Sequence, residues 1–242
     1  APFSPIGNFP YKKETIVLTT QDLMPLNTSC NQKVYNDKTH VPAKTTEEIV
    51  NGVEKRQNLE SLWRIHFYEQ IAKLDLESYI DTTSSWTNPL NIDWVTDNYN
   101  GLRARAGGGV EVHRAIDIFT DEGSEIFAPV DGMVVASADD WKGSWSRRKG
   151  LHNTIGGLGS LSGNGVLVFS PTTSSYFFMI HMKNVYVRAG EIVLKRDVVG
   201  TVGYTGNAIS PRVPKHLHIA YKKPGTECGI EGVLVSENPY PK

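Results

Sequence analysis

Residues 165–182, Gly-Val-Leu-Val-Phe-Ser-Pro-Thr-Thr-Ser-Ser-Tyr-Phe-Phe-Met-Ile-His-Met, contain two runs of apolar, β-prone residues on either side of a Pro/Thr/Ser-rich turn. Short runs of this kind, bounded by turn residues, are typical of β-strands. The same pattern recurs over much of the chain after residue 109, at Val110–Phe119, Glu125–Ala128, Gly132–Ser137, Val185–Val187, Val198–Val202 and His216–Tyr221. Their spacing predicts an antiparallel β-sheet or sandwich, so the fold class is mainly β.

The first hundred residues have a different pattern. Prolines interrupt residues 1–44, and residues 47–78 carry apolar side chains at three- and four-residue spacing, which predicts one long helix. The apolar stripe consists of Leu59, Leu62, Trp63, His66, Phe67, Ile71 and Leu74, among which the histidine is expected to be a packed core residue. Residues 81–110 have the composition of a linker. We therefore divide the chain into an irregular and helical region, residues 1–100, with a regulatory or structural role, and a β-rich region, residues 101–242.

The composition excludes several classes of protein. The 242 residues are 39% hydrophobic and 21% charged, which suits a chain with a sizeable core. No apolar run approaches the roughly 20 residues that cross a bilayer. A net charge of -1 argues against a general nucleic-acid binder. Cys30 and Cys228 form no CxxC pair, which excludes a zinc finger, and whether they form a disulfide stays open.

The sharpest local feature is the pair His216 and His218 around Leu217. Alternate residues of a strand point to the same face, so the two imidazoles project together while the leucine enters the core. Neighbouring imidazoles suit metal binding or paired acid–base chemistry. Two strand histidines on a solvated face are the alternative.

A second feature is His113 with Asp117, four residues later. In a straight strand their side chains would lie about 13 Å apart, too far to share an ion. A bend at Arg114 or Ala115 would bring the two together, and both residue types are suitable zinc ligands. Two histidines and one aspartate, with a fourth position for water, make a catalytic rather than a structural zinc site.

The remaining histidines of the β-rich region differ in their surroundings. His181 lies in the apolar run at 177–182, where a buried core histidine is the plain interpretation. His152 lies in a long loop over about residues 139–164 and is expected to be exposed. Loops of that length in a compact domain are usually functional or disordered.

The order and surroundings of these residues resemble the zinc endopeptidases of the lysostaphin/LytM type, peptidase family M23, over about residues 107–222. The motifs that carry the resemblance are the HxxxD of residues 112–117, the Ala-Pro…Gly stretch of residues 123–135, the lone His181, the glycine-containing run of residues 187–207 and the His-Leu-His of residues 216–219. The order of these motifs and their plausible spacing make the match specific.

The resemblance implies roles for five residues. By position, His113, Asp117 and His218 would bind one zinc ion per chain, and His181 and His216 would be the catalytic histidines. The chain would thus be a metalloendopeptidase, a hydrolase. No HExxH glutamate is present, so the two histidines would share proton handling and oxyanion stabilisation; which of them is the base stays open.

Two positions depart from the family pattern. Ala115 stands where the family often has glycine, so the bend must use an ordinary backbone conformation. Met179 stands where the family usually has a tyrosine, so a phenol that could touch substrate is missing there. Neither change removes a ligand or a catalytic histidine.

The resemblance also implies a substrate and a compartment. The substrate would be the peptide cross-links or stems of bacterial peptidoglycan, which places the enzyme in the periplasm, in the cell envelope or outside the cell. The scissile bond and the oligomeric state stay open. Two alternatives remain: a catalytically silent LytM-like binding or activator module, which the complete ligand set argues against, and a peptidase that acts on a protein.

The long loop is a candidate wall of the substrate groove. Trp141 and Trp145 are expected to stack on sugar rings, and Arg147, Arg148 and Lys149 to meet stem carboxylates. The alternative is a mobile, solvated loop with one tryptophan packed on the core.

Overall fold

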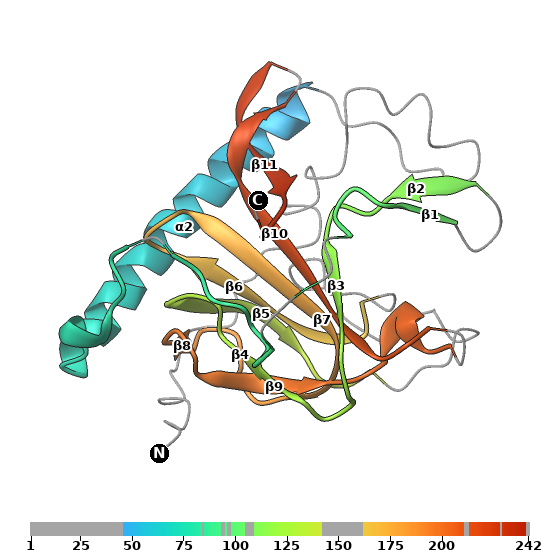
Figure 1. Ribbon diagram of the computed structural model, residues 1–242. Coiled ribbons are helices and arrows are strands. Elements are labelled where there is room, and N and C mark those ends of the chain that lie inside the picture. The colour runs from blue at the N-terminus through green and yellow to red at the C-terminus, as the bar shows by residue number, and fades with distance from the viewer. Residues whose placement is uncertain are drawn as a thin grey trace.

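The computed structural model describes residues 46–83, 85–92, 95, 98–104, 109–141, 162–210, 213–227 and 229–240. Within them a nine-stranded antiparallel sheet stands beside one long helix, and a two-stranded hairpin lies to one side (Figure 1). This confirms the predicted mainly β architecture with a long N-terminal helix. The irregular region at 1–44, both cysteines and His152 lie outside the described residues.

The secondary structure follows the predicted runs, with additions. The helices are α2 (Thr46–Lys73) and the 3-10 helices η3 (Glu77–Tyr79) and η5 (Gly206–Ala208). The strands are β1 (Leu102–Ala104), β2 (Val110–Val112), β3 (Ile116–Phe119), β4 (Glu125–Phe127), β5 (Gly132–Ala138), β6 (Asn164–Ser170), β7 (Ser175–Val185), β8 (Ile192–Val193), β9 (Val198–Val202), β10 (His216–Glu227) and β11 (Ile230–Glu237). The sequence did not predict β1, β8 and β11. The predicted strand at 185–187 is wrong, because Val185 is the last residue of β7.

The sheet has one main order of six strands, and three further strands pair outside that order. Its main order is β11-β10-β7-β6-β5-β8, while β3 pairs with β10, β4 with β9, and β9 with β7. All of these pairs are antiparallel. The first residues of β10 therefore lie between β3 and β7, and the later ones between β11 and β7.

One face of the sheet holds the larger apolar core. It includes the buried side chains of Ile116, Val134, Val168, Phe177, Met179, Leu217 and Ile219. The segment at 85–92 covers part of this face: Leu90 is buried, and Trp86 packs edge-on against Tyr240 with 4.7 Å between ring centroids. The linker predicted over 81–110 is therefore wrong in this part, because its apolar residues find a hydrophobic surface to cover.

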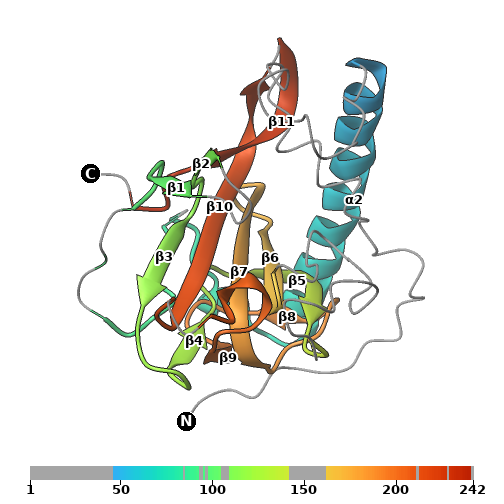
Figure 2. The same cartoon turned by 90° about the vertical axis from the view of Figure 1, so that its right-hand side faces the viewer.

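The opposite face is covered by α2, which Figure 2 shows alongside the sheet, with β3 and β4 on the far side. Trp63 is buried against Phe169 and Tyr176, with ring centroids 5.4 and 6.5 Å away. His66 is buried, as predicted. Among the described residues, no helix combines the length and the hydropathy that a membrane crossing needs.

A buried polar network ties this helix to the sheet. Arg56 donates to the Glu60 carboxylate (2.9 Å) and to the backbone carbonyl of Gly232, and the Tyr176 hydroxyl donates to the same carboxylate (2.7 Å). The α-helix ends at Lys73, five residues before the predicted end. Two residues further on, Asp75 takes a positive φ of 55°.

Candidate metal centre

His113 and Asp117 come together because the chain bends between β2 and β3. The bend lies at Ala115, which is not among the described residues with positive φ, so it is made with an ordinary backbone conformation as predicted. Asn98 fixes the far side of the bend: its side-chain amide donates to the Asp117 carbonyl (2.9 Å), and its Oδ1 accepts from the Asp117 N–H (3.0 Å). His113 Nε2 lies 3.4 Å from Asp117 Oδ1.

His218 reaches the same point from β10. It is registered directly opposite Asp117 of β3, so the two side chains leave the same face of the sheet. Its Nδ1 lies 2.8 Å from Asp117 Oδ1 and 3.2 Å from His113 Nε2. On its other side His218 is opposite Ile180, which packs in the cluster under Trp63. Asp117, His218 and Ile180 therefore lie on the face of the sheet that α2 covers.

The three ligand atoms fit a zinc ion. Each residue offers one donor atom, and these atoms all lie within 4.8 Å of one another. Zinc–nitrogen bonds of about 2.0–2.1 Å at tetrahedral angles place ligand atoms roughly 3.3 Å apart. The three observed separations, 2.8, 3.2 and 3.4 Å, scatter around that distance. Two imidazoles and one carboxylate are also the donor types that zinc prefers.

His181 enters the site from a bulge in β7. The pairing with β6 shifts register at this point, and His181 has a φ of 67°, an uncommon conformation for a residue other than glycine. Its Nδ1 lies 2.9 Å from the carbonyl oxygen of Thr205, so this nitrogen carries the proton and Nε2 is left as an acceptor. Its ring centroid is 5.0 Å from that of His216 and 5.7 Å from that of His218.

His216 is oriented in the same way. Its Nδ1 donates to the carbonyl of Pro214 (2.8 Å), and its Nε2 faces Asp117 Oδ1 at 3.8 Å. The exposed ring of Phe119 lies beside it, with 5.6 Å between centroids. His216 and His181 are both buried, and in each of them Nδ1 is hydrogen-bonded to a backbone carbonyl.

Burial sets the protonation states of the site. It lowers the pKa of His113 to about 4, against the opposing attraction of Asp117. Burial also lowers the pKa of His216, and that of His181 well below its ordinary value. Burial alone would raise the pKa of Asp117, but the hydrogen bond from His218 and the surrounding imidazoles hold it well below its usual range. At neutral pH the carboxylate is ionised and these three histidines are neutral, the forms in which such side chains bind metal or accept protons.

Arg103 of β1 also reaches the site, which the sequence did not predict. Its Nη2 donates to Asp117 Oδ2 and contacts His113 Nε2. The side chain is 34% exposed, so one end of it faces water. Arg103 lies ten residues before His113 and outside any motif, so only the pairing of β1 with β2 reveals it.

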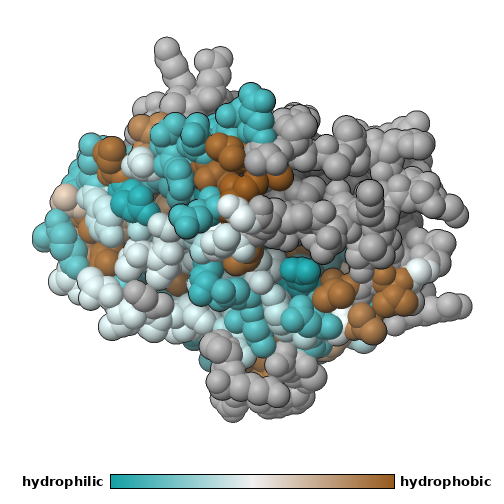
Figure 3. All heavy atoms as spheres, turned by 90° about the horizontal axis from the view of Figure 1, so that it is seen from above, coloured by the Kyte–Doolittle hydropathy of each residue, from teal (hydrophilic) through white to brown (hydrophobic). Residues whose placement is uncertain are grey.

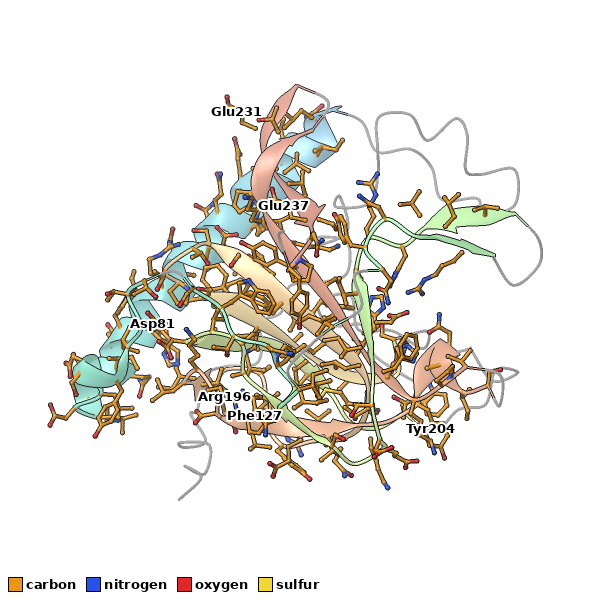
Figure 4. All side chains as sticks on the ribbon, viewed as in Figure 1. Asp81, Phe127, Arg196, Tyr204, Glu231 and Glu237 are labelled. Carbon is orange, nitrogen blue, oxygen red and sulfur yellow. The ribbon has the colours of Figure 1, made fainter. Side chains whose placement is uncertain are left out.

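The residues predicted to bind substrate are only partly described. Trp141 is half-buried, and its backbone N–H donates to Asn164 Oδ1 (3.0 Å). Trp145, Arg147, Arg148 and Lys149 lie outside the described residues. Tyr204, an exposed aromatic that the sequence did not single out, lies beside η5 and next to the Thr205 whose carbonyl fixes His181 (Figure 4).

Apolar side chains are exposed on the hairpin beside the site. Leu102 and Val110 are more than half exposed, and Val112 is exposed as well. Seen from above, an apolar patch lies at the right of the molecule, on the side where Figure 1 shows β1 and β2 (Figure 3).

Comparisons with known proteins match part of this chain to one family model and to one curated relative. The model of "Peptidase family M23" matches residues 111–229. The peptidoglycan DD-endopeptidase ShyC of Vibrio cholerae is 26% identical over 136 residues, which are 55% of this chain and 26% of that protein. This chain therefore aligns with about a quarter of that relative.

Solved structures that match this chain include two peptidase domains. The catalytic domain of lysostaphin from Staphylococcus simulans is 19% identical, with 57% of this chain and 74% of that chain covered and a TM-score of 0.34. The catalytic domain of the prophage-encoded M23 protein EnpA from Enterococcus faecalis is 18% identical, with coverages of 67% and 95% and a TM-score of 0.39.

Proposed function

Because residues 111–229 of this chain belong to peptidase family M23, we propose that the protein is a zinc-dependent endopeptidase that cleaves peptide bonds in the cross-links or stems of bacterial peptidoglycan. The observation that carries the proposal is the set of three donor atoms spaced as a zinc tetrahedron requires. The Vibrio cholerae relative, itself a peptidoglycan DD-endopeptidase, supports the choice of substrate. Such a substrate places the enzyme in the periplasm, in the cell envelope or outside the cell.

In this proposal His113, Asp117 and His218 hold the metal. A bound zinc ion polarises a peptide carbonyl and makes water acidic enough to react near neutral pH. Asn98 keeps the carboxylate of Asp117 in place through two hydrogen bonds to its backbone. The neutral form of His113 at pH 7 leaves its nitrogen free of a proton that a metal would have to displace.

His181 and His216 handle the protons. Each has Nδ1 hydrogen-bonded to a backbone carbonyl, so each presents Nε2 as an acceptor. A neutral imidazole of this kind can take a proton from the attacking water, and once protonated it can donate to the oxyanion or to the leaving amine. Their 5.0 Å centroid separation allows both rings to address one substrate bond.

Substrate would be held by aromatic groups around the metal ligands. Phe119 is exposed beside His216, and the exposed Tyr204 directly precedes Thr205, whose carbonyl oxygen lies 2.9 Å from His181 Nδ1. We assign Trp141, and with it Trp145 and Arg147 of the same loop, to contacts with the sugar and stem portions of the substrate. A catalytically silent binding module would have no use for all five metal-binding and catalytic side chains in one cluster.

Mass spectrometry of fragments released from purified peptidoglycan sacculi tests the proposal. We expect peptide cleavage that a zinc chelator abolishes and added zinc restores, and fragment masses that identify the bond. His218→Ala, which removes one donor atom, is the matched inactive control. Chelator-insensitive release would contradict the zinc mechanism, and absence of release from sacculi of several cross-link types would favour a binding module or a protein substrate.

A further inference from the structure

Arg103 lies on a hairpin that is mechanically coupled to the metal ligands. β1 and β2 pair with Arg103 opposite Glu111, and β2 leads directly into His113. The backbone of His113 is tied back to the start of the hairpin, since its N–H donates to the Gly101 carbonyl (2.9 Å) and its carbonyl accepts from Asn100 (2.7 Å). The position of the guanidinium is therefore set by the same short segment that positions the first ligand.

The contact of Arg103 with His113 uses the atom that a metal needs. A neutral imidazole has one nitrogen that donates and one that accepts. The His113 ring already hydrogen-bonds to the backbone of Asn98, and its Nε2 is the atom that faces both the other ligands and Arg103. A single lone pair can accept an N–H from Arg103 or bind a metal ion, but not both at once.

We propose that Arg103 is a built-in competitor of the metal: its guanidinium holds His113 and Asp117 in the metal-free chain, and it must withdraw when zinc binds. This inference rests on the metal centre of the proposed function. It adds a residue outside the M23-matched segment that sets how tightly this chain binds its metal.

The charge balance explains why an arginine suits this position. Asp117 is the one carboxylate among the four described histidines of the site, and it is buried. A buried carboxylate is costly without a cation beside it. A guanidinium supplies that charge together with directed hydrogen bonds, and it is more weakly hydrated than an ammonium group. When zinc takes over this task, the two cations repel each other.

The part of the hairpin beyond its backbone hydrogen bonds at Gly101 and His113 can also move at low cost. Its two strands have three residues each and pair only with one another among the described residues. A two-stranded hairpin is marginally stable on its own. Leu102, next to Arg103, is 77% exposed, so withdrawal breaks few apolar contacts at that residue. The guanidinium is itself partly in water.

Zinc affinity of the full chain, measured by competition with a chromogenic chelator, tests the inference. We expect Arg103→Gln to bind zinc at least tenfold more tightly than the wild type, about 1.4 kcal/mol. Arg103→Lys should fall between the two, because an ammonium group keeps the charge but loses the planar fork. Arg188→Gln is the matched control, since that guanidinium pairs with Asp139 instead, and its affinity should equal that of the wild type.

Other outcomes separate the two proposals. Unchanged or weaker zinc binding by Arg103→Gln, with zinc bound by the wild type, overturns the competition and leaves the proposed function standing. Absence of zinc binding by the wild type overturns both. Hydrogen exchange on the wild-type chain gives a readout without any variant: adding zinc should accelerate exchange of the β1 and β2 amides and slow that of β10. Slower or unchanged exchange in the hairpin would contradict withdrawal.

Discussion

Two buried polar clusters lie on the same face of the sheet, and they are built in opposite ways. The helix cluster consists of Arg56, Glu60 and Tyr176, beneath α2. The metal cluster consists of His113, Asp117, His181, His216 and His218. In the helix cluster the Arg56 cation pairs with the Glu60 anion, and the remaining donor to that anion is the Tyr176 hydroxyl. The guanidinium also donates to the backbone carbonyl of Gly232.

The metal cluster is not balanced in this way. Four imidazoles surround one carboxylate, and ring nitrogens of His113 and His218 face each other at 3.2 Å. Burial keeps most of these rings neutral instead of allowing them to share the charge of Asp117. Burial thus serves stability in the helix cluster, and in the proposed function it keeps the imidazoles of the metal cluster ready for a cation. Variants in the helix cluster should change stability alone, and variants in the metal cluster should change chemistry.

The largest expected effect separates two histidines of one strand. His218→Ala should lose zinc and with it all measurable turnover, because a ligand is missing. His216→Ala should keep zinc while turnover falls by roughly 10²–10⁴-fold, the usual contribution of a positioned acid–base group. Metal content and sacculus hydrolysis are measured on both variants. Equal loss of zinc would show that the two residues do not have separate roles.

Trp63→Ala tests the helix side of the comparison. Trp63 is 2% exposed, and truncation of such a side chain costs about 3–5 kcal/mol of unfolding free energy. Urea titration measures this loss. At a temperature where the variant is folded, we expect its zinc affinity and kcat/KM to match the wild type. Reduced turnover in the folded variant would instead connect the helix to regulation of the site.

Acid should destabilise the metal-free chain through the metal cluster. Unfolded histidines titrate near pH 6.5, whereas His113 in the fold has a pKa of about 4, and those of His181 and His216 are lowered too. Between these values the unfolded chain binds more protons, so the unfolding free energy is complete above pH 6.5 and falls as the pH drops toward 4. His113 alone contributes about 1.5 kcal/mol between pH 6.5 and 5.

Urea titrations of chelator-treated protein across this window measure the effect. His66→Gln is the control for a contribution from outside the metal cluster, because burial also lowers the pKa of this histidine of α2. Most of the pH dependence should survive in it. A flat profile in the wild type would mean that the site histidines are protonated without cost, against the picture of a cluster held neutral by burial.

The smallest effect concerns one hydroxyl of the helix cluster. Tyr176→Phe removes a hydrogen bond to the Glu60 carboxylate, which keeps Arg56 as its partner. Loss of a bond to a charged group costs about 1.5 kcal/mol or somewhat more. Thermal unfolding measures the loss, with zinc content as the control. A stability equal to that of the wild type would mean that water replaces the hydroxyl and that this cluster is less closed than its contacts suggest.

The sequence predicted those parts of the molecule whose cause is local. Alternation around Leu217 predicted that His216 and His218 share a face, and the bend that brings His113 to Asp117 lies at Ala115, as expected. The strand β11 was missed because glycine and glutamate interrupt its apolar pattern, and only pairing with β10 makes it a strand.

Other features depend on contacts between distant segments. The segment at 85–92 has the composition of a linker, yet Leu90 is buried because the sheet offers an apolar face to cover. Arg103 has no sequence signal, since its importance comes from where the hairpin places it. The bulge at His181 likewise follows from pairing with β6 and is not visible in its apolar run.

That bulge has a consequence for how this chain tolerates insertion and deletion. Phe177 and Met179 point into the larger core, Ile180 points to the opposite face, and Met182 returns to the core. Deleting His181 would leave a regular in-and-out alternation as far as Met182 and would remove a residue held at a φ of 67°. The extra residue in β7 thus costs backbone strain, and what it provides is the His181 ring, placed beside His216 and His218.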